Sequence, residues 1–152
     1  MSESQPEIPA LGFASDFSQD ERHLMGTFGE FIVADPGQDL IQEGNSQDSL
    51  FLVVSGAVHV QTSQTGRTIL LNTLRAGDSV GEINIFDPGE ASATVSANEF
   101  SILWSISRAS LKEFMKEHPS ASGKLLLSIA TQLSKRLREM NEKVAVAQQI
   151  MA

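Results

Sequence analysis

The spacing of hydrophobic and polar residues divides the chain into a central part with strand patterns and a C-terminal part with helical patterns. Between residues 29 and 107, short β-branched runs recur between breaks rich in Gly, Pro, Asn and Asp. Many short strands at close spacing are typical of a sandwich, a barrel or a jelly roll. No segment of crossover-helix length lies between them, which argues against a parallel sheet. The predicted strands cover residues 30–34, 39–42, 50–54, 57–62, 68–74, 93–97 and 100–105.

Helical patterns flank this central part. Ser18 with Glu21 three residues later has the capping-box pattern, which predicts a short helix over residues 16–25. A second short helix over residues 110–117 ends before a proline, because proline disfavours helical backbone at the residue that precedes it. A long helix is predicted from about residue 120 to residue 146 or beyond.

The chain is therefore predicted to be mainly β with flanking helices, in three parts. These parts are a flexible N-terminal arm over residues 1–15, a β-roll with short helices over residues 16–119, and the long C-terminal helix over residues 120–152.

An apolar stripe along the long helix raises the question of what covers it. The stripe either packs on the β-domain of the same chain or forms a two-helix seam with a second chain. The seam is favoured because the helix extends past what a small β-domain can cover, so we expect a homodimer through this helix. The stripe consists of Leu126, Ile129, Leu133, Leu137, Met140, Val144, Ala147 and Met151.

Composition excludes several classes of protein. The chain has 152 residues, no Cys and no apolar run near 18 residues, so neither a disulfide scaffold nor a membrane-spanning helix is expected. Its N-terminus is acidic and lacks the basic and apolar regions of a secretory signal, which predicts a cytoplasmic protein. The net charge of −8 argues against general nucleic-acid binding. The charge is uneven: residues 1–107 carry three bases and 15 acids, whereas residues 108–152 carry eight bases and four acids.

The sequence offers no sign of catalysis. His23, His59 and His118 are far apart, so no clustered metal site is expected. The nucleophile elbow Gly-x-Ser-x-Gly, the Walker loop and the Gly-x-Gly-x-x-Gly fingerprint are all absent. The sequence therefore predicts a binding protein that is not an enzyme and has no metal or resident cofactor.

The segment over residues 76–95 has the layout of an anion-binding site. Gly81 precedes a short helical pattern over residues 82–86, and small residues follow after a Pro-Gly turn. Free N–H groups at a helix N-terminus face an anion, and small residues let a ligand approach the backbone. Glu82 in such a pocket would accept hydrogen bonds from ligand hydroxyls. The candidate ligand-binding residues in this segment are Gly81, Glu82, Ile83, Ala91, Ser92 and Ala93.

This segment and the glycine motifs around it resemble the cyclic-nucleotide-binding domain family, of the catabolite activator protein type. The resemblance covers about residues 15–145 and rests on Gly37 with residues 40–44, on residues 48–56, on Gly77-Asp78 and on Gly81-Glu82. It implies a double-stranded β-helix, or jelly roll, with a short N-terminal and a long C-terminal helix.

The resemblance also implies a mechanism. In the family's phosphate-binding cassette, backbone N–H groups and an arginine hold the cyclic phosphate. A glutamate, matched here by Glu82, binds the ribose 2′-hydroxyl. The C-terminal helix caps the base and carries the signal onward. By the same resemblance, Asn141 falls where a polar side chain reaches the base, and its amide could read a purine edge.

The cassette departs from the family pattern at Ala91, where the family has the phosphate arginine. No other base occurs between Arg75 and Arg108. A hydrogen bond to a charged group contributes about 1.5–3 kcal/mol, and Arg commonly makes two such bonds to one phosphate. Loss of the arginine should therefore weaken cAMP or cGMP binding by about 10- to 1,000-fold. Arg136 lies where the family can carry an arginine near the cassette. It is a surface base, a partner for Glu82, or a substitute for the absent arginine.

Three functions stay open at this point. The chain binds a cyclic mononucleotide weakly, or it binds another ligand such as a cyclic dinucleotide, or it is a binding-silent dimerising interaction module. No helix-turn-helix DNA-binding domain follows the long helix in this chain. We therefore expect no direct DNA regulation and an output that passes to a downstream protein partner.

Overall fold

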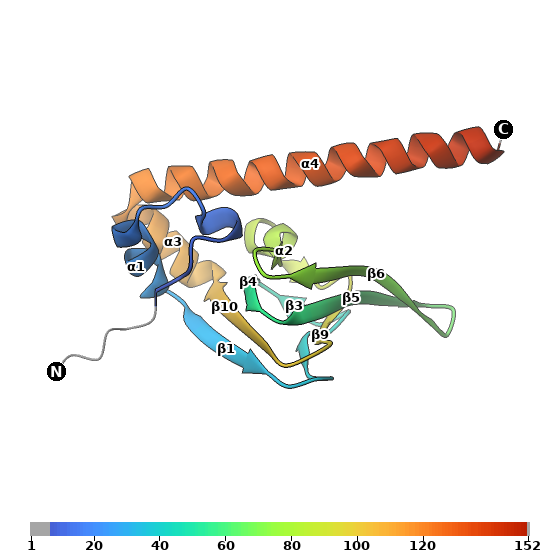
Figure 1. Cartoon of the computed structure of the whole chain (residues 1–152), viewed down its shortest axis with the longest axis horizontal. Helices are drawn as coiled ribbons and strands as arrows, with labels where there is room; N and C mark the ends of the chain where they lie inside the picture. Colours follow the sequence, from blue (N-terminus) through green and yellow to red (C-terminus); the bar gives the residue numbers. More distant parts are fainter. Residues whose placement is uncertain (1–6, 152) are drawn as a thin grey trace.

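Two four-stranded antiparallel sheets form the β-roll and lie beneath a set of helices (Figure 1). The structure is a computed structural model that describes residues 7–151. The first sheet has the order β1 (Glu30–Ala34), β10 (Ser101–Ser107), β4 (Ser49–Ser55), β7 (Ser79–Val80). The second has the order β2 (Asp39–Ile41), β9 (Thr94–Ala97), β5 (Ala57–Gln64), β6 (Arg67–Arg75). A ribbon of β3 (Ser46–Gln47) and β8 (Gly89–Glu90) completes the roll.

The mainly β architecture with flanking helices is as the sequence predicts. All seven predicted strands are present, with ends that differ by at most two residues from the predicted ends. The three strands that the sequence did not predict are β3, β7 and β8. Each has only two residues, which is too short to show an alternating pattern.

The four α-helices of the described residues also follow the sequence signals. They are α1 (Gln19–Gly26), α2 (Glu82–Phe86), α3 (Arg108–Glu117) and α4 (Pro119–Met151). A 3₁₀ turn, η1 (Gly12–Ala14), precedes them and was not predicted. The capping box at α1 is present: Glu21 N–H donates to Ser18 Oγ at 3.2 Å, and Ser18 N–H donates to Glu21 Oε1 at 2.9 Å. Within the described residues, no helix combines the length and the hydrophobicity needed to cross a membrane.

The prediction of a flexible arm over residues 1–15 is wrong for residues 7–15. Ile8 and Phe13 are fully buried, and the Phe13 ring lies 6.4 Å from that of Trp104. Gly12 adopts φ +52°, and a Cβ there would lie 2.1 Å from the carbonyl oxygen of Gly77. This segment is held by individual apolar side chains around a three-residue turn, so it has no period for sequence analysis to detect. Residues 1–6 lie outside the described part of the chain.

Two apolar cores form because the side chains of a strand alternate between its faces. On the first sheet, Leu52 and Trp104 face the helices, whereas Val53 and Leu103 face the interior of the roll. The helix-side core takes in α3 and the start of α4. The second core fills the space between the two sheets, beneath the pocket described below.

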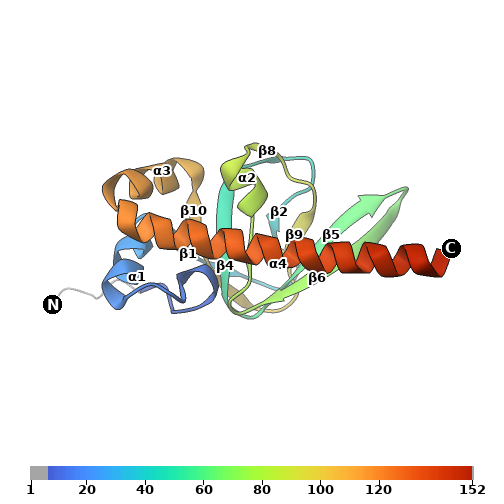
Figure 2. The same ribbon diagram turned by 90° about the horizontal axis from the view of Figure 1, so that it is seen from above.

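The long helix α4 has a docked part and a projecting part. Leu125 and Ile129 are buried in the helix-side core, and Leu133 packs at its edge. The predicted stripe began at Leu126, but Leu126 is only half-buried and its neighbour Leu125 is the core residue. Past Leu133 the helix continues beyond α2 and above the β5–β6 hairpin, with Leu137 63% exposed (Figures 1 and 2).

An ion pair joins α1 to α4 beside this core. Lys124 Nζ lies 2.7 Å from Glu21 Oε1. The hydrogen bond from Lys124, together with that from the Ser18 backbone, lowers the pKa of Glu21 below its usual value. The docked part of α4 is thus held by its buried apolar side chains and, at the edge of the core, by the ion pair between Lys124 and Glu21.

Two leucines on α4 offer a matched test of this docking. Leu125→Ala should lower the free energy of unfolding by about 2–5 kcal/mol, because it leaves a cavity at a fully buried position. Leu127→Ala makes the same change at a position that is 71% exposed and should cost less than about 0.5 kcal/mol. Urea unfolding followed by circular dichroism measures both. Equal losses for the two variants would contradict the docking of α4.

Candidate functional site

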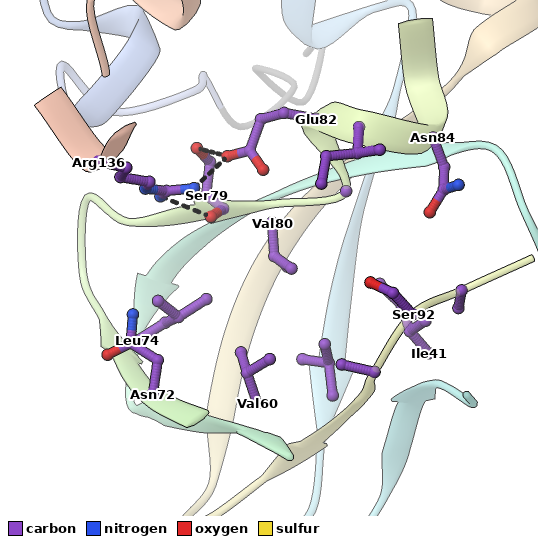
Figure 3. A pocket seen from close by; sticks show the side chains of 15 residues that line it. Ile41, Val60, Asn72, Leu74, Ser79, Val80, Glu82, Asn84, Ser92 and Arg136 are labelled. Carbon is purple, nitrogen blue, oxygen red and sulfur yellow. Dashed lines mark hydrogen bonds and ion pairs between the residues drawn. The ribbon is translucent and has the colours of Figure 1, made fainter. Parts of the chain in front are cut away.

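A pocket of about 220 Å³ opens between the β-roll and α4 (Figure 3). Its floor is apolar and comes from the five strands β2, β5, β6, β7 and β9. Its walls carry amide, hydroxyl and charged groups. The apolar residues are Ile41, Val60, Leu74, Val80 and Val95, and the polar ones are Asn72, Ser79, Glu82, Asn84, Ser92 and Arg136.

The backbone at Gly81 places α2 against this pocket. Gly81 has φ +96°, a conformation that side chains rarely allow, and it precedes the first residue of α2. A Cβ at Gly81 would lie 2.1 Å from the carbonyl oxygen of Ser49 on β4. Because β7 pairs with β4 just before this glycine, the chain turns into α2 directly beside the sheet. A glycine is therefore required at this position both for its φ and for the close approach.

Glu82 is the buried charged group of the site, with 5% of its surface exposed. Its Oε1 accepts a hydrogen bond from Ser79 Oγ and lies 3.4 Å from Arg136 Nη1. Arg136 Nη2 also donates to the Ser79 carbonyl oxygen at 3.1 Å (Figure 3). A buried carboxylate needs such partners to offset its desolvation. These contacts join β7, α2 and α4 at one point.

The second oxygen of Glu82 has no protein partner. Within the described residues, Glu82 Oε2 accepts no hydrogen bond, and the two contacts to Glu82 that are drawn in Figure 3 both reach the other oxygen. A carboxylate oxygen with free lone pairs in a partly apolar pocket is a strong acceptor for a hydroxyl donor.

The opposite end of the pocket is formed by residues 91–93. Ala91 is 5% exposed, and its backbone is fixed to the distant turn at residues 44–45: its N–H donates to the Asn45 carbonyl at 2.8 Å, and its own carbonyl accepts from Gly44 N–H at 2.9 Å. Ser92 projects toward the pocket, across it from Arg136 (Figure 3). The only cation among the lining residues of the described chain is Arg136, so this end has no positive side chain.

The structure brings seven of the eight candidate residues together. The pocket is lined by Gly81, Glu82, Ile83, Ala91, Ser92, Ala93 and Arg136. Of the three alternatives for Arg136, the geometry agrees with a partner for Glu82, since its guanidinium is engaged there and lies across the pocket from Ser92.

Asn141 is the candidate that does not reach the pocket of its own chain. It is exposed on α4, five residues after Arg136. Five residues advance a helix by about 7.5 Å and rotate the side chain by about 140°. Asn141 therefore lies further along α4 and on another face than Arg136.

Sequence analysis missed three polar residues of the lining, Ser79, Asn72 and Asn84. Ser79 fixes Glu82, and the only sequence signal for it is its place three residues before the glutamate. Asn72 and Leu74 lie on the same face of β6, and the period of two in the predicted strand 68–74 could have placed them together. Among the described residues, no group of three or more His, Asp or Glu side chains is arranged to hold a metal ion.

Comparisons with known proteins agree with this geometry. The family model of the cyclic nucleotide-binding domain matches residues 31–118. A CRP-like cAMP-activated global transcriptional regulator of Mycobacterium tuberculosis is 30% identical over 110 residues, which are 72% of this chain and 47% of that protein. The chain thus spans about half the length of the curated relatives that it matches.

Solved structures share the fold. A cyclic nucleotide-binding domain from Methylobacillus flagellatus has a TM-score of 0.79 at 25% identity, over 85% of this chain and 73% of that one. The catabolite activator protein of Thermus thermophilus has a TM-score of 0.78 at 23% identity, over 90% of this chain and 62% of that one. The jelly roll with a short N-terminal and a long C-terminal helix is thereby confirmed. The chain belongs to the cyclic nucleotide-binding domain family, of the CRP type.

Proposed function

We propose that this chain is a non-catalytic regulatory module whose pocket binds a cyclic mononucleotide weakly. The observation that carries the proposal is the fixed, buried carboxylate of Glu82, with one oxygen held by Ser79 and Arg136 and the other free. This group is set to accept a hydrogen bond from the ribose 2′-hydroxyl. Because the protein has already immobilised the carboxylate, the ligand does not have to order it on binding.

The cyclic phosphate then lies toward residues 91–93. The hydroxyl of Ser92 and nearby backbone donors contact it there, with no cation beside them. Glu90, exposed next to Ala91, adds a negative charge on this side. Hydrogen bonds between Arg and phosphate are among the strongest in proteins, so a site without one should bind a cyclic phosphate weakly.

The base has room on the other side of the pocket. A neighbouring cavity of about 340 Å³ lies between β6 and α4 and shares Asn72, Leu74 and Arg136 with the first. Small-molecule sites usually have volumes of about 300–1,000 Å³, so a nucleotide needs more than the first cavity of about 220 Å³. We place the base over Leu74 and Asn72, with its outer edge next to α4.

Restoring the missing charge tests this proposal. Ala91→Arg should strengthen cAMP or cGMP binding by about tenfold or more, since it adds a charge-assisted contact to the phosphate. Ala91→Met adds similar length without charge and serves as the matched control, for which we expect no gain. Isothermal titration calorimetry with each nucleotide measures both variants and the unchanged protein.

Two outcomes would contradict the proposal. Submicromolar cAMP binding by the unchanged protein would show that the arginine is dispensable here. Failure of Ala91→Arg to bind either nucleotide better, in a folded protein, would leave a binding-silent module or a different ligand, such as a cyclic dinucleotide, as the better account.

We further propose that two chains associate through the projecting part of α4. Leu137, Met140 and Val144 are exposed at intervals of three and four residues, and Ala147 and Met151 continue the same row. This is the heptad spacing of a two-helix seam, and an unpaired row of this kind is costly to leave in water. Because Arg136 is on the same helix, a ligand in the pocket could change the seam and pass a signal to a protein partner. We place this activity in the cytoplasm.

Two lysine substitutions on α4 test the dimer. Val144→Lys places a charge in the seam and should shift the protein toward a monomer of 16.4 kDa at micromolar concentration. Gln149→Lys adds the same charge on the opposite face and should leave the dimer intact. Light scattering coupled to size-exclusion chromatography measures the mass of each. A monomeric unchanged protein would refute the seam.

A further inference from the structure

A second cavity lies behind α2, on the side of the helix away from the nucleotide pocket. Glu82 and Ile83 line the nucleotide pocket, whereas Ile85 and Phe86, from the last turn of the same helix, line the second cavity. Its other walls come from α3 and α4, and both α2 and α3 are seen on one side of α4 in Figure 2. Its volume is about 330 Å³.

The second cavity has an apolar lining and two positively charged residues at its rim. Ile85, Leu111, Met115 and Leu126 supply the aliphatic surface, and Phe86 adds an exposed ring at the edge. Arg108 and Lys112 are the charged residues of the lining. They are four residues apart on α3 and therefore lie on the same face of that helix.

Neither cation is neutralised by a carboxylate. In residues 7–151, the ion pairs are Lys124 with Glu21 and Arg136 with Glu82, and neither involves this rim. Arg108 Nη1 donates to the Ile85 carbonyl oxygen at 2.5 Å, which leaves further guanidinium N–H groups for another acceptor. Both cations belong to residues 108–152, where bases outnumber acids by eight to four.

We propose that this cavity binds an aliphatic carboxylate of medium chain length. The carboxylate would lie between Arg108 and Lys112, and the alkyl chain would lie over Leu111, Met115 and Leu126. A volume of about 330 Å³ is at the lower end of the range for small-molecule sites.

Occupation of this cavity has a consequence for the nucleotide pocket. Arg108 is hydrogen-bonded to the carbonyl of Ile85, so a ligand on the guanidinium acts on the last turn of α2. Glu82 begins the same five-residue helix. The carboxylate site and the nucleotide pocket therefore share one short rigid element, and the two sites can influence each other through it. The binding proposal itself does not depend on nucleotide binding.

Titration with decanoate below its micelle concentration tests the site without any nucleotide. In the full chain labelled with ¹⁵N and ¹³C-methyl groups, decanoate should cause saturable shifts at Ile85, Leu111 and Met115, with smaller shifts at the amides of Gly81 and Glu82. Decanol, with the same chain and no charge, should bind more weakly, and acetate should cause no saturable shift.

Charge reversal at the rim provides the matched variants. Lys112→Glu should weaken decanoate binding by about tenfold or more, because it removes a charge-assisted contact and adds repulsion. Lys112 is exposed, so the substitution should leave the fold intact. Arg67→Glu makes a comparable charge change at an exposed position on β6 and should leave binding unchanged. Equal binding of decanoate and decanol, equal binding by Lys112→Glu, or shifts that do not saturate would each overturn the proposal.

Discussion

The burial of one carboxylate organises this protein. Glu82 is almost fully removed from water, and it stays there because Ser79 donates to one oxygen and Arg136 lies beside the same oxygen. Those two partners lie on β7 and α4. The carboxylate of Glu82, on α2, can therefore be buried only where β7, α2 and α4 meet. Gly81 makes the meeting possible, since a side chain there would collide with the backbone of β4. The position of α4 over the pocket is thus tied to the electrostatics of the pocket.

The two ends of the pocket differ in the charged groups that face the cavity. At the Glu82 end a fixed charge with a free oxygen can select a ligand that carries a hydroxyl group. At the Ala91 end the backbone is locked to the turn at residues 44–45, but no cation faces the cavity. The family fold is therefore retained around a site for which we propose a reduced attraction for a phosphate. Membership of the family therefore does not by itself determine how strongly the pocket binds a nucleotide, because binding also depends on the charges that face the cavity.

Much of this fold could be predicted from sequence, because its main strands and helices carry local signals. The β-branched runs between turn-forming breaks in β4, β5 and β10 and the capping box at Ser18 were sufficient to define those elements. The packing of residues 7–15 was not predictable in this way, since Ile8 and Phe13 are held by distant residues rather than by a local pattern. At the site, the cassette residues were found through their glycines and small residues. Ser79 was missed because its role depends on three-dimensional contact with Glu82. Asn141 lies outside the pocket of its own chain, because a motif does not specify the rotation of a helix.

The most direct test of this account compares cAMP with 2′-deoxy-cAMP by calorimetry, on the unchanged protein and on two glutamate variants. If Glu82 receives the 2′-hydroxyl, the unchanged protein should prefer cAMP by about 10- to 100-fold, as expected for a hydrogen bond to a charged group. Glu82→Gln should lose most of that preference, whereas Glu90→Gln, which removes an exposed carboxylate outside the pocket, should keep it. Equal binding of the two nucleotides by the unchanged protein would contradict the role assigned to Glu82.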